Sequence, residues 1–379
     1  MKKLQKISLS LILLTIFSLA LGAAWTSKRL SNNTGSSYNP AIAVDGANVY
    51  VAWHDSTPGS AEIYFRKSTD NGSTWPAAKR ITFTSGFSGC PDIAANGSTV
   101  YIVYQDDTAG NSDIYFRKST DGGATWEAAK NVTDNWWESY NAKITISGSN
   151  IFVVWQDNTP GNYEIYFKKS TDAGVTWQSQ KRLTNNSGAS LDPDIVSYDA
   201  NLYVVWHDDS SGDKEICFRR SLDGGDNWQS QKQLTSNAGL SEYAAIAVGG
   251  SLGSDLYVVW QDSTPGKFDI HFRKSTDKGA TWETCKNLTH NSGDSNCPSI
   301  AVRGANVYVT WYDITPGTTE IYVKKSADSG STWQSSKRIT NNVGASNNPV
   351  IALSASNQYV TFHDYTPGNY EIFVKYAPL

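Results

Sequence analysis

An eight-residue segment recurs six times and constrains the fold more than any other feature of the sequence. Its pattern is Ser-x-Asp-x-Gly-x-Thr/Asn-Trp. The copies step by 51 residues, with one step of 54, and their aspartates are Asp70, Asp121, Asp172, Asp223, Asp277 and Asp328. Units of about 50 residues cannot bury a core alone, so this period indicates a solenoid, a propeller or another stacked array.

Each repeat also predicts four short β-strands. In the first repeat they cover residues 40–44, 49–54, 63–67 and 80–82, separated by turns rich in Gly, Pro and Asn. Short, evenly spaced strands of this kind are typical of all-β repeat proteins. Four antiparallel strands per unit predict the blade of a β-propeller.

A second signature, an aromatic residue followed two positions later by Asp, counts the blades. It occurs seven times, with the aspartates Asp55, Asp106, Asp157, Asp208, Asp262, Asp313 and Asp364. The seventh unit ends after its third strand, and residues 27–31 resemble a fourth strand that lacks a blade. We therefore predict one seven-bladed β-propeller over residues 25–379, closed by the N-terminal strand pairing with the last blade, which removes open sheet edges. An insertion at residues 249–255 explains the longer step.

Residues 1–24 are predicted to be a secretory signal peptide, with three lysines before an apolar run and small residues at its end. A retained membrane anchor is the alternative; after cleavage we expect no membrane span and a secreted or cell-surface protein. Removing those lysines changes the net charge from −4 to −7. The absence of a basic stripe argues against nucleic acid as a partner. We expect a monomer in which Cys217 is a buried thiol and Cys285 and Cys297 lie too far apart to bridge.

The six segments resemble the Asp boxes (BNR repeats) of the sialidase-like superfamily, and the resemblance covers nearly all of residues 25–379. It implies the fold rather than a function, because the family includes sialidases, other glycoside hydrolases, lectins, sorting receptors and assembly factors. We interpret the box as a structural turn: Asp172 bonds within the turn, Gly174 allows positive φ, and Trp177 packs between blades. A metal or ligand site at each box is the alternative.

The resemblance implies that a site lies on the face opposite the boxes, where two sets of polar residues recur. The first set lies between the aromatic residue and its Asp and includes His54, His207, Tyr312 and His363. The second set comes seven residues after that Asp and includes Glu62, Glu164, Glu215, Glu320 and Glu371. One interpretation is turn capping and bonding at strand starts. The other is a polar pocket for sugars. We expect no cofactor, with calcium as the alternative that oxygen ligands would favour.

Sialidase chemistry, as the resemblance implies it, needs three converging arginines, a Tyr nucleophile supported by Glu, and an Asp acid/base. The Arg-Ile-Pro motif of the family is absent, and the arginines lie mostly at repeated strand positions. Sialidases are usually six-bladed, whereas this count is seven. We therefore predict no catalytic residues and keep an exo-acting sialidase-like glycoside hydrolase as the alternative.

The clearest departure from the repeat is the segment Asp134-Asn135-Trp136-Trp137-Glu138-Ser139-Tyr140. Two adjacent tryptophans in a loop are costly to expose, and indole rings stack well on sugars. Trp136, Trp137 and Tyr140 are therefore our preferred ligand contacts, with Phe83 and Phe87 as an extension; a Trp that plugs the gap between two blades is the alternative. The sequence predicts non-catalytic binding of a glycan or cell-surface polymer, and a protein-interaction scaffold is the third hypothesis.

Overall fold

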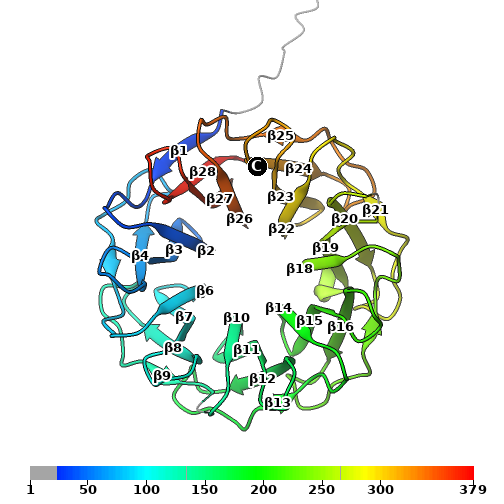
Figure 1. The fold of residues 1–379 in the computed structure, drawn as a ribbon, viewed down its shortest axis with the longest axis horizontal. Coiled ribbons are helices and arrows are strands. Elements are labelled where there is room, and N and C mark those ends of the chain that lie inside the picture. Colours follow the sequence, from blue (N-terminus) through cyan, green and yellow to red (C-terminus); the bar gives the residue numbers. More distant parts are fainter. Residues whose placement is uncertain (1–23, 134, 265) are drawn as a thin grey trace, which may run out of the picture.

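Seven four-stranded antiparallel sheets form a closed ring in the computed structural model (Figure 1). The structure describes residues 24–133, 135–264 and 266–379. The predicted signal peptide therefore lies outside the described residues, apart from Ala24. Each sheet has its first strand nearest the ring axis and its fourth strand at the rim (Figure 1). The predicted seven-bladed β-propeller is thus confirmed.

The strands keep nearly the same length from blade to blade. The first strands are β2 (Ser37–Asp45), β6 (Ser88–Asn96), β10 (Ser139–Ser147), β14 (Ser190–Tyr198), β18 (Ser241–Gly249), β22 (Ser295–Arg303) and β26 (Ser346–Leu353). The second strands are β3 (Asn48–Asp55), β7 (Thr99–Asp106), β11 (Asn150–Asp157), β15 (Asn201–Asp208), β19 (Asp255–Asp262), β23 (Asn306–Asp313) and β27 (Asn357–Asp364). The third strands are β4 (Glu62–Ser68), β8 (Asp113–Ser119), β12 (Glu164–Ser170), β16 (Glu215–Ser221), β20 (Asp269–Ser275), β24 (Glu320–Ser326) and β28 (Glu371–Pro378).

The fourth strands are the shortest. They are β5 (Lys79–Arg80), β9 (Lys130–Asn131), β13 (Lys181–Arg182), β17 (Lys232–Gln233), β21 (Lys286–Asn287), β25 (Lys337–Arg338) and β1 (Thr26–Arg29). The sequence predicts that the first of them covers residues 80–82, whereas β5 in the structure covers only Lys79–Arg80. Thr82 lies outside the strand, and its hydroxyl accepts a hydrogen bond from the amide of Ile63 at 2.7 Å. The insertion in blade 5 forms a short 3₁₀ helix, η1 (Ser251–Gly253).

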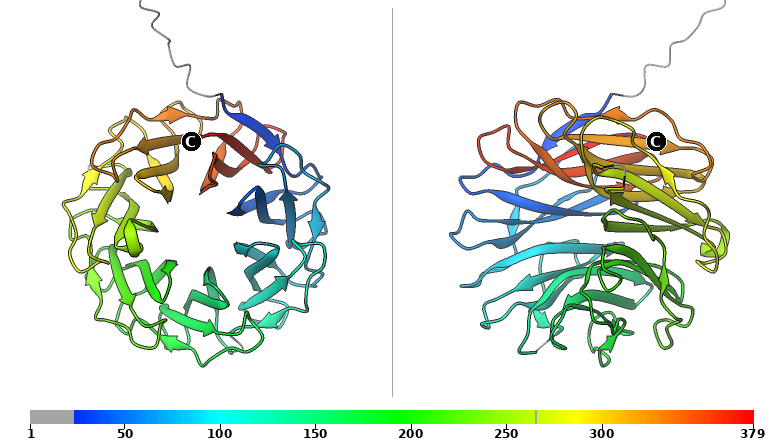
Figure 2. Two further views of the ribbon diagram at one scale, coloured as in Figure 1. Left: turned by 180° about the vertical axis from the view of Figure 1, so that it is seen from behind. Right: turned by 45° about the vertical axis from the view of Figure 1, so that its right-hand side comes forward.

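The ring closes as predicted, by β1 pairing with β28. Thr26 lies opposite Tyr376, and Arg29 lies opposite Phe373. Seen from behind, the two strands lie side by side at the seam (Figure 2). The buried side chain of Leu30 joins a core cluster with Ile372 and Val374, so the seam is packed as well as hydrogen-bonded.

The core consists of apolar clusters between neighbouring blades. The five second-strand tryptophans are at most 1% exposed: Trp53, Trp155, Trp206, Trp260 and Trp311. The box tryptophans also pack across blades, as predicted: Trp177 meets Phe116 of the preceding blade edge-on, with 5.2 Å between ring centroids. Aromatic pairs in this arrangement stabilise by about 0.5–1.5 kcal/mol beyond area burial.

The boxes are tight turns held by their own side chains. Asp172 accepts hydrogen bonds from the amide and the hydroxyl of Thr176 at 2.8 and 2.5 Å. Ser170 donates its hydroxyl to Asp172 and accepts from the amide of Gly174. These hydrogen bonds lower the pKa of Asp172 to about 2. The same bonds recur in all six copies, which matches the structural interpretation.

Candidate functional site

The turns sort the ring into two faces. In blade 3 the box amide of Ala173 donates to Ser149 O at 2.9 Å, so the box lies beside the turn that joins the first two strands. The turns between second and third strands and the blade-to-blade loops lie at the opposite strand ends. We call that side the loop face. It carries every ligand-binding residue predicted from the sequence.

The seven aspartates of the aromatic-x-Asp signature cap turns on the loop face. Asp55 Oδ1 accepts from the amide of Thr57 at 2.8 Å, and Asp55 Oδ2 accepts from the hydroxyl of Ser37 at 2.5 Å. The hydrogen bond from a backbone amide to Asp Oδ1 recurs in every blade. These contacts match the turn-capping interpretation.

The acids seven residues further on are buried inside their blades. Glu62, Glu164, Glu215, Glu320 and Glu371 are at most 4% exposed. Glu62 accepts from Arg80 of the fourth strand at 2.6 Å and from the amide of Thr84 at 2.8 Å. Glu164 and Glu371 bind Arg182 and Arg29 in the same way. The carboxylates therefore hold the fourth strand and the loop after it, and direct ligand contact by them stays a prediction.

A ring of side chains that the sequence did not predict surrounds the axis below the loop face. The third residue of each first strand has positive φ at a β-bulge: Asn39, Cys90, Asn141, Asp192, Tyr243, Cys297 and Asn348. Neighbours touch: Asn348 Nδ2 donates to Asn39 Oδ1 at 3.0 Å, and Asn141 Nδ2 donates to Asp192 Oδ1 at 2.6 Å. We call these seven residues the bulge ring. The position varies in residue type, so only its fixed place after the repeated Ser could have revealed it.

The predicted second-strand residues support the bulge ring from behind. His54 Nδ1 accepts from the amide of Cys90 at 3.3 Å, and the oxygen of Gln156 accepts from the amide of Asp192 at 2.8 Å. His54 and His363 are buried, and burial lowers the pKa of each to about 4. Both imidazoles are therefore neutral at pH 7. They meet through Tyr38, whose ring lies 5.7 Å from His54 and 5.4 Å from His363.

His207 and Tyr312 lie in a more charged part of the ring. His207 is buried, and neither of its ring nitrogens has a hydrogen-bond partner among the described residues. Its Nδ1 lies 3.9 Å from Asp192 Oδ2, and its ring lies 6.0 Å from that of Tyr243. Glu242 is beside them, paired with Lys214 at 2.5 Å. Blades 4–6 thus depart from seven-fold symmetry by gathering acids, phenols and one histidine that has no hydrogen-bond partner among the described residues.

Trp136 and Trp137, in the loop that joins blade 2 to blade 3, project from the loop face. Trp136 is 94% exposed and Trp137 is 50% exposed. Trp136 is therefore not packed between two blades, and Trp137 is only half-buried. Tyr140 is half-buried and donates its hydroxyl to Glu138 Oε2 at 2.6 Å. Asp134, the first residue of the predicted segment, lies outside the described residues.

The backbone beneath these tryptophans is fixed by polar contacts. Asn111, from the turn of blade 2, donates to the carbonyls of both Asn135 and Trp137 at 2.9 Å. Asn135 Oδ1 accepts from the amide of Trp137 at 2.7 Å, and Asn135 Nδ2 donates to Asp157 at 2.8 Å. The indoles are thus presented on a pre-formed loop, which reduces the ordering cost of binding.

The preceding blade-to-blade loop carries the two predicted phenylalanines. Phe83 is 75% exposed and lies against the guanidinium of Arg80, 4.6 Å from its ring centroid. Phe87 points instead to His54, with 5.5 Å between rings. The amide of Phe87 donates to Asp107 at the other end of the turn that holds Trp137. One turn of blade 2 therefore separates the two aromatic loops.

Most arginines in the described part of the chain form hydrogen bonds or ion pairs between blades or within one blade. Arg66 and its counterparts on third strands donate to carbonyls of the preceding blade. Arg29, Arg80 and Arg182 bind the buried glutamates. Over residues 24–133, 135–264 and 266–379, no group of three His, Cys, Asp or Glu side chains forms a metal site. The four cysteines are free thiols, and Cys217 is buried as predicted.

A family model described as a BNR repeat-like domain matches residues 106–310. A sialidase of Bacteroides fragilis (strain YCH46) is 25% identical over 240 residues, covering 53% of this chain and 43% of the relative. Glucosamine inositolphosphorylceramide transferase 1 of Oryza sativa subsp. japonica is 23% identical over 184 residues, covering 44% and 24%. The chain thus spans less than half the length of these curated relatives.

Solved propellers share the fold at low identity. The polysaccharide lyase Uly1 has a TM-score of 0.64 at 10% identity, with 92% of this chain and 91% of that chain covered. The α-L-arabinofuranosidase Arb93A of Fusarium graminearum has a TM-score of 0.55 at 12% identity, with 94% and 98% covered. An α-L-arabinanase of Penicillium chrysogenum has a TM-score of 0.54 at 13% identity, with 82% and 99% covered. At these identities the similarity shows the fold alone. In the described part of this chain no helix is long and apolar enough to cross a bilayer.

Proposed function

Because the chain belongs to the BNR repeat-like domain family, we propose that it binds carbohydrate on the loop face, with Trp136 and Trp137 as the main contact. The observation that carries this proposal is the exposure of two adjacent indoles, 94% and 50%, on a hydrogen-bonded loop. Large aromatic side chains are rarely left in water without a partner. An indole offers an apolar face for a sugar ring and an N–H for a hydroxyl.

The surroundings of the pair support a sugar more than an apolar protein partner. Asn111, Asn135 and Glu138 lie at the base of the loop and offer amide and carboxylate groups. Sites that orient ligands combine apolar platforms with a few placed polar groups. The names of the similar proteins, which include a sialidase, a polysaccharide lyase and an α-L-arabinanase, fit the same ligand class. Calcium is not part of this proposal.

A second candidate function is glycoside hydrolysis near the bulge ring. The observation that favours it is the group of Asp192, Glu242 and His207, because paired carboxylates are the usual catalysts of this reaction. Two features weigh against a Tyr nucleophile there. Burial raises the pKa of Tyr243 to about 12 and also raises the pKa of Tyr312. We therefore rank hydrolysis below binding.

We also propose that the protein acts outside the cell as a monomer, from the composition of residues 1–24 and the closed ring. Localising the full chain with and without residues 1–24 tests the first part. Retention of the full chain in the cytoplasm would contradict it.

A glycan array run beside a fluorogenic glycoside assay separates the candidate functions. We expect selective binding of one glycan class and no turnover above a protein-free blank. Turnover that is lost in Asp192→Asn and Glu242→Gln would favour the hydrolase. Absence of binding to every glycan would contradict the proposal and favour a protein-interaction scaffold.

A further inference from the structure

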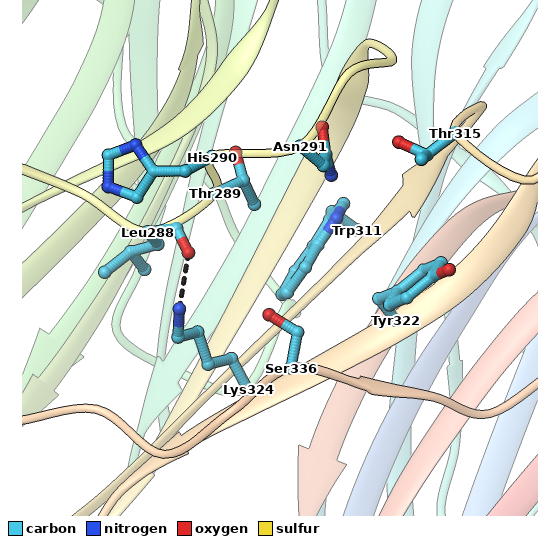
Figure 3. Close-up of a pocket in the computed structure, with 9 residues that line it drawn as sticks. All are labelled: Leu288, Thr289, His290, Asn291, Trp311, Thr315, Tyr322, Lys324 and Ser336. Carbon is cyan, nitrogen blue, oxygen red and sulfur yellow. Dashed lines mark hydrogen bonds between the residues drawn. The ribbon is translucent and has the colours of Figure 1, made fainter.

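A cavity of about 310 Å³ opens between blades 5 and 6. It lies between the loop that follows β21, which contributes Leu288 and Asn291, and the strands β23 and β24, which contribute Trp311 and Lys324. Trp311 lies in the middle of the lining side chains, with Asn291 on one side and Ser336 on the other (Figure 3). The volume of the cavity is at the lower end of the range for ligand pockets, about 300–1,000 Å³.

The third-strand cation beside the cavity is a lysine, where most blades have an arginine. In every blade a third-strand cation donates to a carbonyl of the preceding blade: Arg66, Arg117, Lys168, Arg219, Arg273, Lys324 and Lys375. The four arginines also donate to the carbonyl ten residues further along their own blade. Lys324 makes the first bond, to Leu288 O at 2.5 Å.

The lining has the chemistry of a sugar site. Trp311 and Tyr322 stack with 5.9 Å between ring centroids and an interplanar angle of 18°, forming an apolar wall. Thr315 and Ser336 add hydroxyl groups. The Oδ1 atom of Asn291 is buried without a hydrogen-bond partner among the described residues, so it can accept from a ligand hydroxyl.

The charge of the lining is one-sided. Lys324 contributes a cation, and no carboxylate belongs to the lining residues. No ion pair within 4.0 Å in the described part of the chain involves Lys324, and burial lowers its pKa. A half-buried cation without a counter-ion is unfavourable, so an anionic group entering the cavity gains both attraction and hydrogen bonds.

We propose that this cavity binds an anionic sugar unit of a polysaccharide, with the sugar carboxylate at Lys324 and its ring against Tyr322. The inference deepens the proposed carbohydrate binding and rests on it for the ligand class. It adds a second site, because the cavity lies at the blade 5–6 boundary whereas Trp136 belongs to the blade 2–3 loop. Two sites on one closed ring favour a long ligand through avidity.

Calorimetric titration of the full chain with glucuronate and with neutral methyl glucoside tests the proposal. We expect glucuronate to bind at least about tenfold more tightly. Lys324→Met keeps a similar side-chain length but removes the charge, so it should abolish the preference for glucuronate. Lys324→Arg restores the side chain of four other blades. Because those arginines also donate to a carbonyl of their own blade, the variant's charge should be held by the protein, and glucuronate binding should weaken at least about tenfold while the fold is kept.

Lys168→Met and Lys168→Arg are the matched controls at the blade 2–3 boundary, and they should bind glucuronate like the wild type. The double variant Trp136→Ala/Trp137→Ala should also bind it unchanged, so failure of this site and failure of the proposed loop contact are distinguishable. No glucuronate binding by the wild type, or unchanged binding by both Lys324 variants, would overturn the proposal.

Discussion

Gly174 shows how closely one residue of a box is fitted to the neighbouring blade. Its φ is +83°, and an added Cβ would lie 2.6 Å from Phe116 of blade 2. Gly148 also has positive φ, +61°, but nothing lies within 4 Å of its Cβ position. The two glycines therefore separate backbone strain from steric overlap.

Gly174→Ala should lower the free energy of unfolding by more than Gly148→Ala does. The control pays only the left-handed backbone cost, about 1 kcal/mol, and the clash with Phe116 should add about 1–3 kcal/mol. Urea unfolding followed by tryptophan fluorescence measures both. Equal losses in the two variants would contradict the packing seen between box and blade.

His54 and His363 should make stability depend on pH. In the unfolded chain their pKa is about 6.5, whereas burial lowers it to about 4 in the folded chain. Between these values the unfolded chain binds more protons than the folded chain. The contribution of the neutral histidines to the free energy of unfolding is therefore fully present above pH 6.5 and is lost as the pH drops to 4. The loss should be about 3 kcal/mol per histidine, since each pKa unit corresponds to about 1.4 kcal/mol.

The double variant His54→Gln/His363→Gln should flatten that profile. Glutamine is the natural residue of blades 2, 3 and 5 at this position, so the fold is compatible with it. Thermal unfolding midpoints between pH 4 and pH 7 measure the slope. An unchanged slope in the double variant would mean that other groups cause the loss.

At the scale of elements, β1 closes the ring. It covers one edge of β28, buries Leu30 and places Arg29 2.9 Å from Glu371. A chain that starts at Asn32 should lose about 2 kcal/mol from Leu30 alone, and the bare β28 edge should promote association. A chain that starts at Trp25 is the control. Equal thermal midpoints and equal sedimentation of the two chains would contradict closure by β1.

The turn of blade 2 should matter for binding because it holds the tryptophan loop. Asn111→Ala removes two hydrogen bonds to that loop, so the indoles should be less ordered and glycan binding about threefold to tenfold weaker. Asn162→Ala removes the equivalent bonds, to Asn186 and Gly188, in blade 3. Affinity for the best array glycan is the measurement, and the Asn162 variant should match the wild type.

At the scale of the whole molecule, the sequence predicts what the repeat itself encodes. The box period and the seven Asp signatures give the blade number, the four-strand unit and the closing strand, because these depend on local pattern and on counting. The structural role of each buried acid depends on partners about twenty residues away in the sequence. For Glu62 these partners are Arg80 and the amide of Thr84. The sequence therefore left two interpretations open.

The parts that the sequence did not reveal are contacts between blades. The bulge ring escaped because Asn, Cys, Asp and Tyr share its position, so no motif marks it. The cavity beside Lys324 escaped because it forms between two blades, from the loop after β21 and the strands β23 and β24, and no motif marks such a contact. Trp136 and Trp137 could be found because they break the repeat.

The affinity of a Trp136→Ala/Trp137→Ala variant for the best array glycan tests the central claim, which is carbohydrate binding on the loop face. Val175→Ala, an exposed residue of a box on the opposite face, is the control. Contacts of this kind are worth about 2 kcal/mol or more, so calorimetry should show binding at least about tenfold weaker in the double variant and unchanged in the control. Affinity equal to the wild type in the double variant would contradict the claim.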